Sequence, residues 1–260
     1  MSQLNTLFRK RIGFTESNKI SFSDLEHILK KTAFNIPFEN ICIINKNSNE
    51  ITKDSLIRKI LLKNEGGLCY ELNAILYLFL IENGFKASLV SGVVYDPVKS
   101  EYQNIGRTHV TILLSHEGQT YLIDTGFGAN LPLKPVPLNG DIVISHNGEF
   151  RIIKEKTAYG DYILEIKLKH KDIDWRIGYA FDSETTIDEI SDLNEIQTII
   201  KEHEKSPFNK NPLITKLTNE GNVTLTNTSF TQWKNGTVLK EDIESEKFKE
   251  LMKKIFNHKE

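Results

Sequence analysis

The sequence is short of the residues on which several protein classes depend. Its 260 residues include only two cysteines, two tryptophans and two methionines. Two thiols cannot form a disulfide framework, and they are too few for a cysteine-rich zinc site. Glycine and proline, with 15 and 7 residues, are too sparse for a collagen-like or low-complexity chain. These absences favour an ordinary globular protein.

The chain also lacks an excess of one charge and a long apolar run. Lysine and arginine number 33 against 35 aspartates and glutamates, so no broad positive field favours nucleic acid or an anionic membrane as a partner. The longest apolar stretch, 72–81, is far shorter than the roughly 20 residues of a membrane span. The basic residues at 9–11 precede no apolar run of the kind found in secretory signals. We therefore expect a cytoplasmic protein.

The first third of the chain has the three-and-four spacing of apolar residues that is typical of helices. Ser21 can cap one helix and Thr52 another. A third helix is predicted from Cys69, directly after a pair of glycines, to Asn83–Gly84, where glycine can end it. This helix is apolar on all sides, which predicts that it runs through the middle of the protein with Cys69 at its N-terminus.

From residue 86 the pattern changes to period two with β-branched residues, which predicts antiparallel strands for a small barrel or a sandwich. The expected strands are 87–95, 109–115, 119–124, 149–154, 161–169 and 175–181. Thr186 and Glu189 have the spacing of a capping box and predict a helix to about His203. Hairpins with turns at 220–221 and 235–236 and a last amphipathic helix over 241–257 should follow, all packed as one compact unit.

Cys69 is a candidate nucleophile. A cysteine attacks as the thiolate, which the partial positive charge of a helix N-terminus and a neighbouring imidazolium both favour. The predicted helix supplies the first of these. The alternative is that Cys69 is a small buried core residue. Cys42, in an apolar stretch, is expected to be buried and unreactive.

His109 and Asp124 are candidate partners for that thiol. If a hairpin turns at Glu117–Gly118, Thr111 faces Asp124 and His109 becomes a diagonal neighbour of Asp124 on one face. The carboxylate could then fix the tautomer of the imidazole and stabilise its protonated form, as in a nucleophile–base–acid triad. The alternative is a histidine satisfied by an acid on a barrel strand.

Several blocks of the sequence resemble the arylamine N-acetyltransferase family. The segment 66–73 is similar to the family's Arg-Gly-Gly-x-Cys motif at the start of a central helix, and 35–40 to its Pro-Phe-Glu-Asn segment. The histidine strand at 107–109 and the 122–128 block, similar to Val-Asp-x-Gly-Phe-Gly, follow in order. The segments 205–208 and 221–225 resemble the part that follows the family's barrel, so the similarity covers nearly the whole chain.

The resemblance implies an α+β fold with a cysteine-protease-like triad of Cys69, His109 and Asp124. It implies an N-terminal helical bundle at 1–85, a central antiparallel β-barrel at 86–185 and a C-terminal α/β lid at 186–260. Acetyl-CoA would donate an acetyl group, through an acetyl-cysteine and ping-pong kinetics, to a small aromatic amine or hydrazine in xenobiotic metabolism. The motifs identify neither the physiological acceptor nor the oligomeric state.

The resemblance also implies which residues contact the substrates. Phe38 and Phe127 match positions that line the acceptor pocket. The CoA-binding residues would be Gly106, Thr108, Ser206 and Phe208. No metal is implied, and the seven histidines, His258 among them, show no spacing that suits one.

One position departs from the family motif. Glu65 stands where the family has arginine before the two glycines. That arginine is expected to pair with an acid, for which Glu39 is the natural candidate, so Glu65 would leave two carboxylates uncompensated unless Arg58 or Lys63 substitutes. Negative charge near Cys69 would also oppose its thiolate and weaken activity.

Other readings of the same motifs stay open at this stage. A cysteine hydrolase, a transglutaminase-like enzyme or an amide synthase could use the same triad. A catalytically silent paralogue that keeps the fold is a further alternative, for which Glu65 is the sequence feature. Incubation with acetyl-CoA would distinguish these readings, because each predicts a different fate for the acetyl group.

Overall fold

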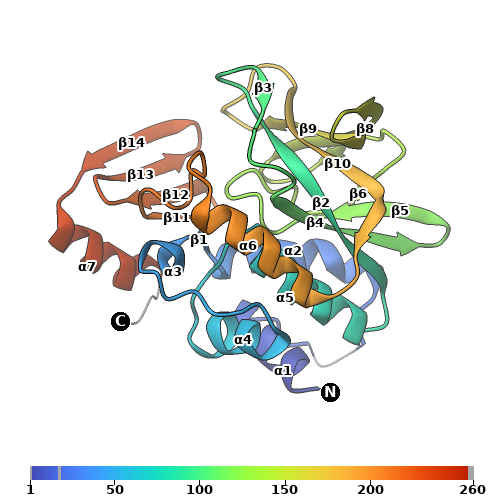
Figure 1. The fold of residues 1–260 in the computed structure, drawn as a ribbon, viewed down its shortest axis with the longest axis horizontal. Helices are drawn as coiled ribbons and strands as arrows, with labels where there is room; N and C mark the ends of the chain where they lie inside the picture. Colours follow the sequence, from blue (N-terminus) through green and yellow to red (C-terminus); the bar gives the residue numbers. More distant parts are fainter. Residues whose placement is uncertain (1, 17–18, 257–260) are drawn as a thin grey trace.

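In the computed structural model, which describes residues 2–16 and 19–256, helices lie below two antiparallel sheets (Figure 1). The α-helices are α1 (Gln3–Ile12), α2 (Leu25–Asn35), α3 (Ile41–Ile44), α4 (Lys53–Leu56), α5 (Cys69–Glu82), α6 (Leu193–Glu202) and α7 (Ser245–Phe256). A π-helix (Ile57–Leu62) continues α4, and 3-10 turns (Phe22–Asp24 and Ile190–Asp192) precede α2 and α6. Among these residues, none of the helices is long and apolar enough to cross a membrane.

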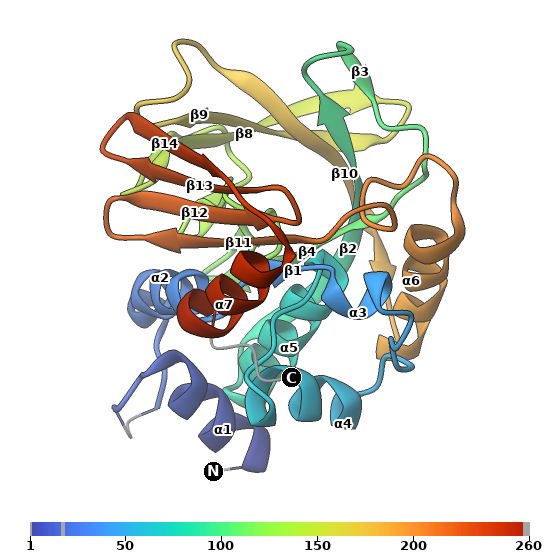
Figure 2. The same ribbon diagram turned by 90° about the vertical axis from the view of Figure 1, so that its left-hand side faces the viewer.

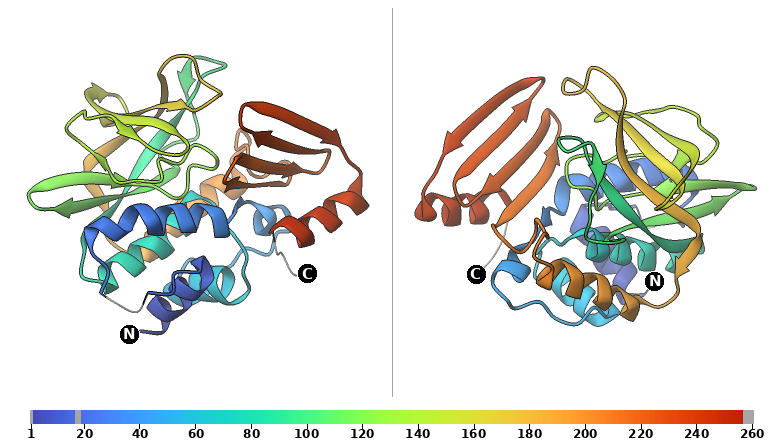
Figure 3. Two further views of the ribbon diagram at one scale, coloured as in Figure 1. Left: turned by 180° about the vertical axis from the view of Figure 1, so that it is seen from behind. Right: turned by 45° about the horizontal axis from the view of Figure 1, so that its top comes forward.

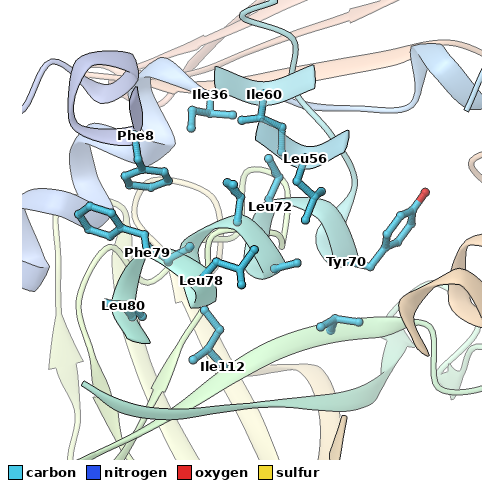
Figure 4. Close-up of a cluster of buried hydrophobic side chains, with 14 of the residues drawn as sticks. Phe8, Ile36, Leu56, Ile60, Tyr70, Leu72, Leu78, Phe79, Leu80 and Ile112 are labelled. Atoms are coloured by element: carbon cyan, nitrogen blue, oxygen red, sulfur yellow. The ribbon is translucent and has the colours of Figure 1, made fainter. Parts of the chain in front are cut away.

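Helix α5 forms the centre of the helical region, as its sequence predicts. It is buried from Cys69 to Leu80 except at Tyr77, and Gly84, in the left-handed region at φ 85°, follows its end. The Phe79 ring stacks on Phe8 of α1 with centroids 4.4 Å apart, beside the aliphatic side chains drawn in Figure 4. The two earlier predicted helices are present: Ser21 caps the 3-10 turn that leads into α2, and Thr52 caps α4, which continues as the π-helix.

The second region is a nearly closed antiparallel barrel. Its strands are β2 (Lys86–Asp96), β3 (Glu101–Tyr102), β4 (His109–His116), β5 (Gln119–Ile123), β6 (Val136–Pro137), β7 (Val143–Ile144), β8 (Gly148–Thr157), β9 (Gly160–Leu168) and β10 (Arg176–Ile187). They pair in the order β6-β5-β4-β2-β10-β9-β8-β7, with β3 on β2, and β6 lies against β8 where the sheet nearly meets itself. All six predicted strands are present. Strand β4 lies directly over α5.

The third region is a sheet that includes two residues from the helical region. Strands β11 (Leu213–Thr218), β12 (Gly221–Thr226), β13 (Ser229–Lys234) and β14 (Thr237–Asp242) form successive hairpins. Strand β1 (Phe38–Glu39) pairs with β11, so that Phe38 faces Thr215. Helix α7 packs against this sheet, which stands beside the barrel in Figures 2 and 3. The pairing of β1 with β11 ties residues 38–39 to a segment far along the chain.

Two boundaries predicted from the sequence are wrong. Thr186 does not cap a helix, because it lies inside β10, where it pairs with Val90 of β2. The capping box is formed by Glu189 and Asp192 instead. The last helix begins at Ser245 and not at 241, because residues up to Asp242 pair with β13; residue 257 lies outside the described residues. Strand β10 runs past residue 185, while the division into three domains at 85 and 185 stays a prediction.

Candidate active site

Cys69 lies at the first position of α5, in the wall of a cleft between the three regions. Its side chain is 6% exposed, and its Sγ donates to the backbone oxygen of Thr108 at 3.3 Å. Leu68, in extended conformation, is the N-cap, and its N–H donates to Glu71 Oε2 at 3.0 Å. The sulfur is therefore held beside the unpaired N–H groups of a helix start.

The hairpin of β4 and β5 brings His109 to Asp124 in the register expected from the sequence. Ile112 pairs with Ile123, and His116 with Gln119, which places the turn at Glu117–Gly118. Asp124 directly follows β5, and its Oδ2 lies 2.8 Å from His109 Nε2. With Nε2 so engaged, Nδ1 is the remaining ring nitrogen, and the neighbouring Cys69 raises the pKa of this imidazole. The three side chains are thus neighbours, with a direct hydrogen bond between His109 and Asp124.

The carboxylate of Asp124 is fully buried and fully bonded. Besides His109, Oδ2 accepts from the hydroxyl of Tyr179 in β10 at 2.8 Å. Oδ1 accepts from Asn73 Nδ2 at 2.9 Å and from the N–H of Gly126 at 2.7 Å. The motif segment 66–73 includes Asn73, whereas the sequence did not indicate Tyr179, because only the pairing of β10 with β2 brings that strand to the site.

Electrostatics favour a charged His109–Asp124 pair. Burial alone would lower the pKa of His109, but the adjacent Asp124 carboxylate and the contact with Cys69 outweigh it and raise that pKa to about 10. Burial would raise the pKa of Asp124, whereas His109, Asn73 and the Gly126 N–H together lower it. The imidazole is therefore held protonated and the carboxylate ionised.

The cleft beside Cys69 has a volume of about 290 Å³. Four predicted substrate contacts, Phe38, Thr108, Phe127 and Phe208, line it. The other two do not: Gly106 is exposed at φ 83°, and Ser206 is buried with its hydroxyl accepting from the Phe208 N–H. The sequence did not point to further polar lining residues, which are Gln103, Asn130, Lys171, Thr215 and Thr224.

A lysine replaces the arginine that the family motif led us to expect. Lys59 Nζ lies 2.6 Å from Glu71 Oε1 and 3.9 Å from Glu39 Oε1. The predicted substitutes do not reach these acids: Arg58 is exposed, and Lys63 lies 3.9 Å from Glu65 itself. The sequence pointed to the wrong cations because residues 57–62 form a π-helix. Its wider turn directs Lys59, and not Arg58, toward the two acids.

Cys42 lies beside Lys59 and is partly exposed rather than buried. Burial of its sulfur and the negative charge of Glu71 raise the pKa of this thiol to about 12, against the opposing effect of Lys59. Cys42 is therefore a thiol at neutral pH. Among the residues that the structure describes, which exclude His258, no three His, Cys, Asp or Glu side chains are placed to hold a metal ion.

Comparisons with known proteins match this chain over nearly its full length. The N-acetyltransferase family model matches residues 21–259. An uncharacterized acetyltransferase of Bacillus subtilis, YvcN, is 42% identical over 248 residues, which are 95% of each chain. Arylamine N-acetyltransferase C from Bacillus anthracis has a solved structure that is 40% identical, covers 100% of both chains and superposes with a TM-score of 0.95.

Two further solved structures bear on the site. An arylamine N-acetyltransferase from Bacillus cereus, 44% identical with 97% of each chain covered and a TM-score of 0.92, is described with a unique Cys-His-Glu catalytic triad. In the present chain the acid bonded to His109 is an aspartate. The enzyme from Mycobacterium marinum, solved in complex with CoA, shares the fold at 20% identity, with 97% of this chain and 92% of that one covered and a TM-score of 0.84. By sequence and by fold, the chain belongs to the arylamine N-acetyltransferase family.

Proposed function

We propose that this enzyme transfers the acetyl group of acetyl-CoA to the nitrogen of an arylamine, arylhydrazine or N-hydroxyarylamine by a ping-pong mechanism. The observation that carries the proposal is the position of Cys69 beside the hydrogen-bonded His109–Asp124 pair, at the wall of a cleft with aromatic sides. Cys69 is the nucleophile, His109 the proton carrier and Asp124 the group that orients His109.

In the first half-reaction the Cys69 thiolate attacks the thioester carbonyl of acetyl-CoA. N–H groups at the start of α5 stabilise the oxyanion that develops on the carbonyl oxygen. The carbon–sulfur bond to CoA then breaks, and the departing thiolate takes the proton of His109. An acetyl-Cys69 thioester remains.

In the second half-reaction the amine nitrogen attacks the carbonyl carbon of acetyl-Cys69. His109, now neutral, takes the proton that the nitrogen loses, and the bond from carbon to Sγ breaks. The products are the N-acetylated amine and a Cys69 thiolate beside a protonated His109, the state from which the first half-reaction starts. Asp124, with four hydrogen bonds, keeps the imidazole in place through both steps.

The cleft suits both substrates. Phe127 lies 5.2 Å from the His109 ring and Phe38 lies 5.6 Å from Phe208, centroid to centroid, so flat rings can be held beside the sulfur. For the CoA arm, Thr108 and Phe208 offer a wall on either side of Cys69, and Gly106 and Ser206 border these two residues in sequence. The CoA complex of the M. marinum enzyme supports a donor site in this fold. Location in the cytoplasm stays a prediction of the sequence.

Mass spectrometry of the intact protein after incubation with acetyl-CoA tests the proposal. We expect the mass of one acetyl group on the wild type and on Cys42→Ser, none on Cys69→Ser, and loss of the label when an arylamine is added. Acetate release that does not depend on the amine would instead indicate a hydrolase. A wild-type protein that never becomes labelled would contradict the proposal.

A further inference from the structure

A buried lysine lies behind the start of the nucleophile helix. Lys59 belongs to the π-helix that follows α4, and its side chain is 12% exposed. Its ammonium contacts Glu71 Oε1 at 2.6 Å, Cys42 Sγ at 2.9 Å and, more distantly, Glu39 Oε1 at 3.9 Å. Short π-helical segments are frequent at functional sites because the wider turn changes where a side chain points.

Both acids beside Lys59 are bonded to the segment that leads into Cys69, Glu71 through its carboxylate and Glu39 through its backbone. Glu71 Oε2 accepts from the N–H of Leu68, the residue before Cys69, at 3.0 Å. The N–H of Glu39 donates to the backbone oxygen of Gly67 at 3.0 Å. A Cβ on Gly67 would lie 2.9 Å from Glu71 Oε2, so backbone and carboxylate are in close contact. The Glu71 carboxylate thus holds Leu68 in place, and the backbone of Glu39 holds Gly67.

Lys59 supplies the positive charge of this cluster, one ammonium beside two carboxylates. The side chains of Glu39 and Glu71 are 1% and 6% exposed, and buried carboxylates are costly unless they are paired. In the described part of the chain, the ion pairs to both acids come from Lys59. Without its ammonium, two negative charges would be left next to the helix start that carries Cys69.

We infer that Lys59 is a positioning residue for acetyl transfer. It takes the role of the arginine that the family has at the position of Glu65. Through Glu71 it fixes residues 67–68, and it offsets the negative charge of Glu71 and Glu39, which would oppose the Cys69 thiolate. Glu65 lines the same cavity of about 70 Å³ as Lys59, Glu71 and Cys42, so a cation placed at 65 could reach the same acids. The expected effect of Lys59 on turnover rests on the proposed function. Its expected effect on the reactivity of the Cys69 thiol does not.

The test compares Lys59→Met, Lys59→Arg and the double variant Lys59→Met/Glu65→Arg with the wild type. Lys63→Met is the matched control, because Lys63 lines the same cavity with a 59% exposed side chain that faces Glu65. The first readout is the rate at which iodoacetamide alkylates Cys69 across pH, followed on the Cys69 peptide so that Cys42 is counted separately. The second is kcat and KM for acetyl-CoA and an arylamine.

We expect Lys59→Met to alkylate Cys69 about tenfold more slowly at neutral pH, with its pH profile moved upward, and to lose at least about tenfold in kcat with little change in KM. Lys59→Arg and the double variant should lie within about threefold of the wild type, since both restore a cation. Glu39 and Glu71 face Lys59 directly, Cys42 lies beside it as a neutral thiol, and all three residues are present in every variant. Lys63→Met should behave as the wild type.

Wild-type alkylation and kcat in a folded Lys59→Met would overturn the inference, as would a loss that neither arginine variant relieves. If Lys59→Met does not fold, the two arginine variants decide: recovery of folding, alkylation and kcat supports the inference, and folding without recovery of either rate overturns it. If the wild type transfers no acetyl group while Lys59→Met still slows alkylation, the proposed function fails and the positioning role stands.

Discussion

At the scale of single residues, the site depends on groups that are ionised although buried. Asp124 has no exposed side-chain surface, yet each of its oxygens accepts two hydrogen bonds, which replace the water that the carboxylate loses on folding. His109 is 3% exposed, and it stays protonated because the Asp124 carboxylate raises its pKa. A fold that stabilises this ion pair must therefore also be stabilised by it.

The stability of the protein should depend on pH through this pair. The pKa of His109 is raised from 6.5 to about 10 in the folded chain, so its contribution to the free energy of unfolding is complete below pH 6.5 and is lost as pH rises through about 10. Asp124, whose pKa is lowered, contributes above its unfolded value of 3.8 and loses that contribution as pH falls through its folded pKa. Urea unfolding of wild type and His109→Asn between pH 6 and 10 measures the first effect.

The difference in unfolding free energy between these two proteins should shrink by on the order of a few kcal/mol across that range. His116→Asn is the control, because His116 is partly exposed on the far end of β4 and should leave the slope unchanged. A difference that is constant from pH 6 to 10 would mean that His109 is not protonated in the folded protein.

At the scale of elements, local sequence signals were sufficient where an element is specified by its own residues. The apolar run of α5 and its glycine end predicted a buried helix, and the hairpin turn at 117–118 fixed the register that joins His109 to Asp124. Thr186 was misassigned because its pairing partner, Val90, is nearly a hundred residues away in sequence. Helix α1 was not among the helices predicted from spacing, although Leu4, Phe8 and Ile12 repeat every four residues and Ser2 and Gly13 cap it.

Helix α5 and the loop after β5 are in such close contact at Gly126 that one added methyl group should disturb the site. A Cβ on Gly126 would lie 2.6 Å from Cys69 Cα and 2.8 Å from Asn73 Nδ2. Gly126→Ala must therefore push Asp124 and α5 apart, and we expect a stability loss of about 2 kcal/mol and a fall of about a hundredfold in kcat/KM. Thermal unfolding and steady-state kinetics of the acetyl transfer measure both.

Gly118→Ala separates these two effects. In the β4–β5 turn a Cβ would have nothing within 4 Å, but φ of 78° disfavours alanine by about 1 kcal/mol. This variant should lose stability and keep its kcat/KM. Equal losses of kcat/KM in both variants would show that the activity follows overall stability and not the fit of Gly126 against Cys69.

At the scale of the whole molecule, the cleft is assembled from segments that no local pattern connects. Phe38 comes from the helical region, Phe127 from the barrel and Phe208 from the segment between α6 and β11, and all three line it. Residue by residue, the family resemblance indicated these aromatics correctly as neighbours of the cleft. It could not indicate Lys59 or Tyr179, because each reaches the site only through packing between separate elements.

Asn40 holds two of these regions together. Its side chain is fully buried, donates from Nδ2 to the backbone oxygens of Phe208 and Asn211 at 2.9 Å each, and accepts from the Leu213 N–H at 2.8 Å. Asn40→Ala removes three part-buried hydrogen bonds, which should cost about 3 kcal/mol at about 1 kcal/mol for each bond. Because Phe208 then loses its fixed place opposite Phe38, KM for the arylamine should rise about tenfold while acetylation of Cys69 persists.

Asn194→Ala provides the comparison that makes this prediction specific to the cleft. Asn194 accepts from the Ile51 N–H at 2.8 Å and donates to the Ser191 oxygen at 2.8 Å, so its loss also breaks bonds between distant segments, but none of these residues lines the cleft. We expect it to lower the unfolding free energy and leave KM for the arylamine unchanged. If Asn40→Ala lowers stability in the same way without raising KM, then residues 208–213 contribute to the fold alone, and the acceptor is bound by the barrel and the helical region.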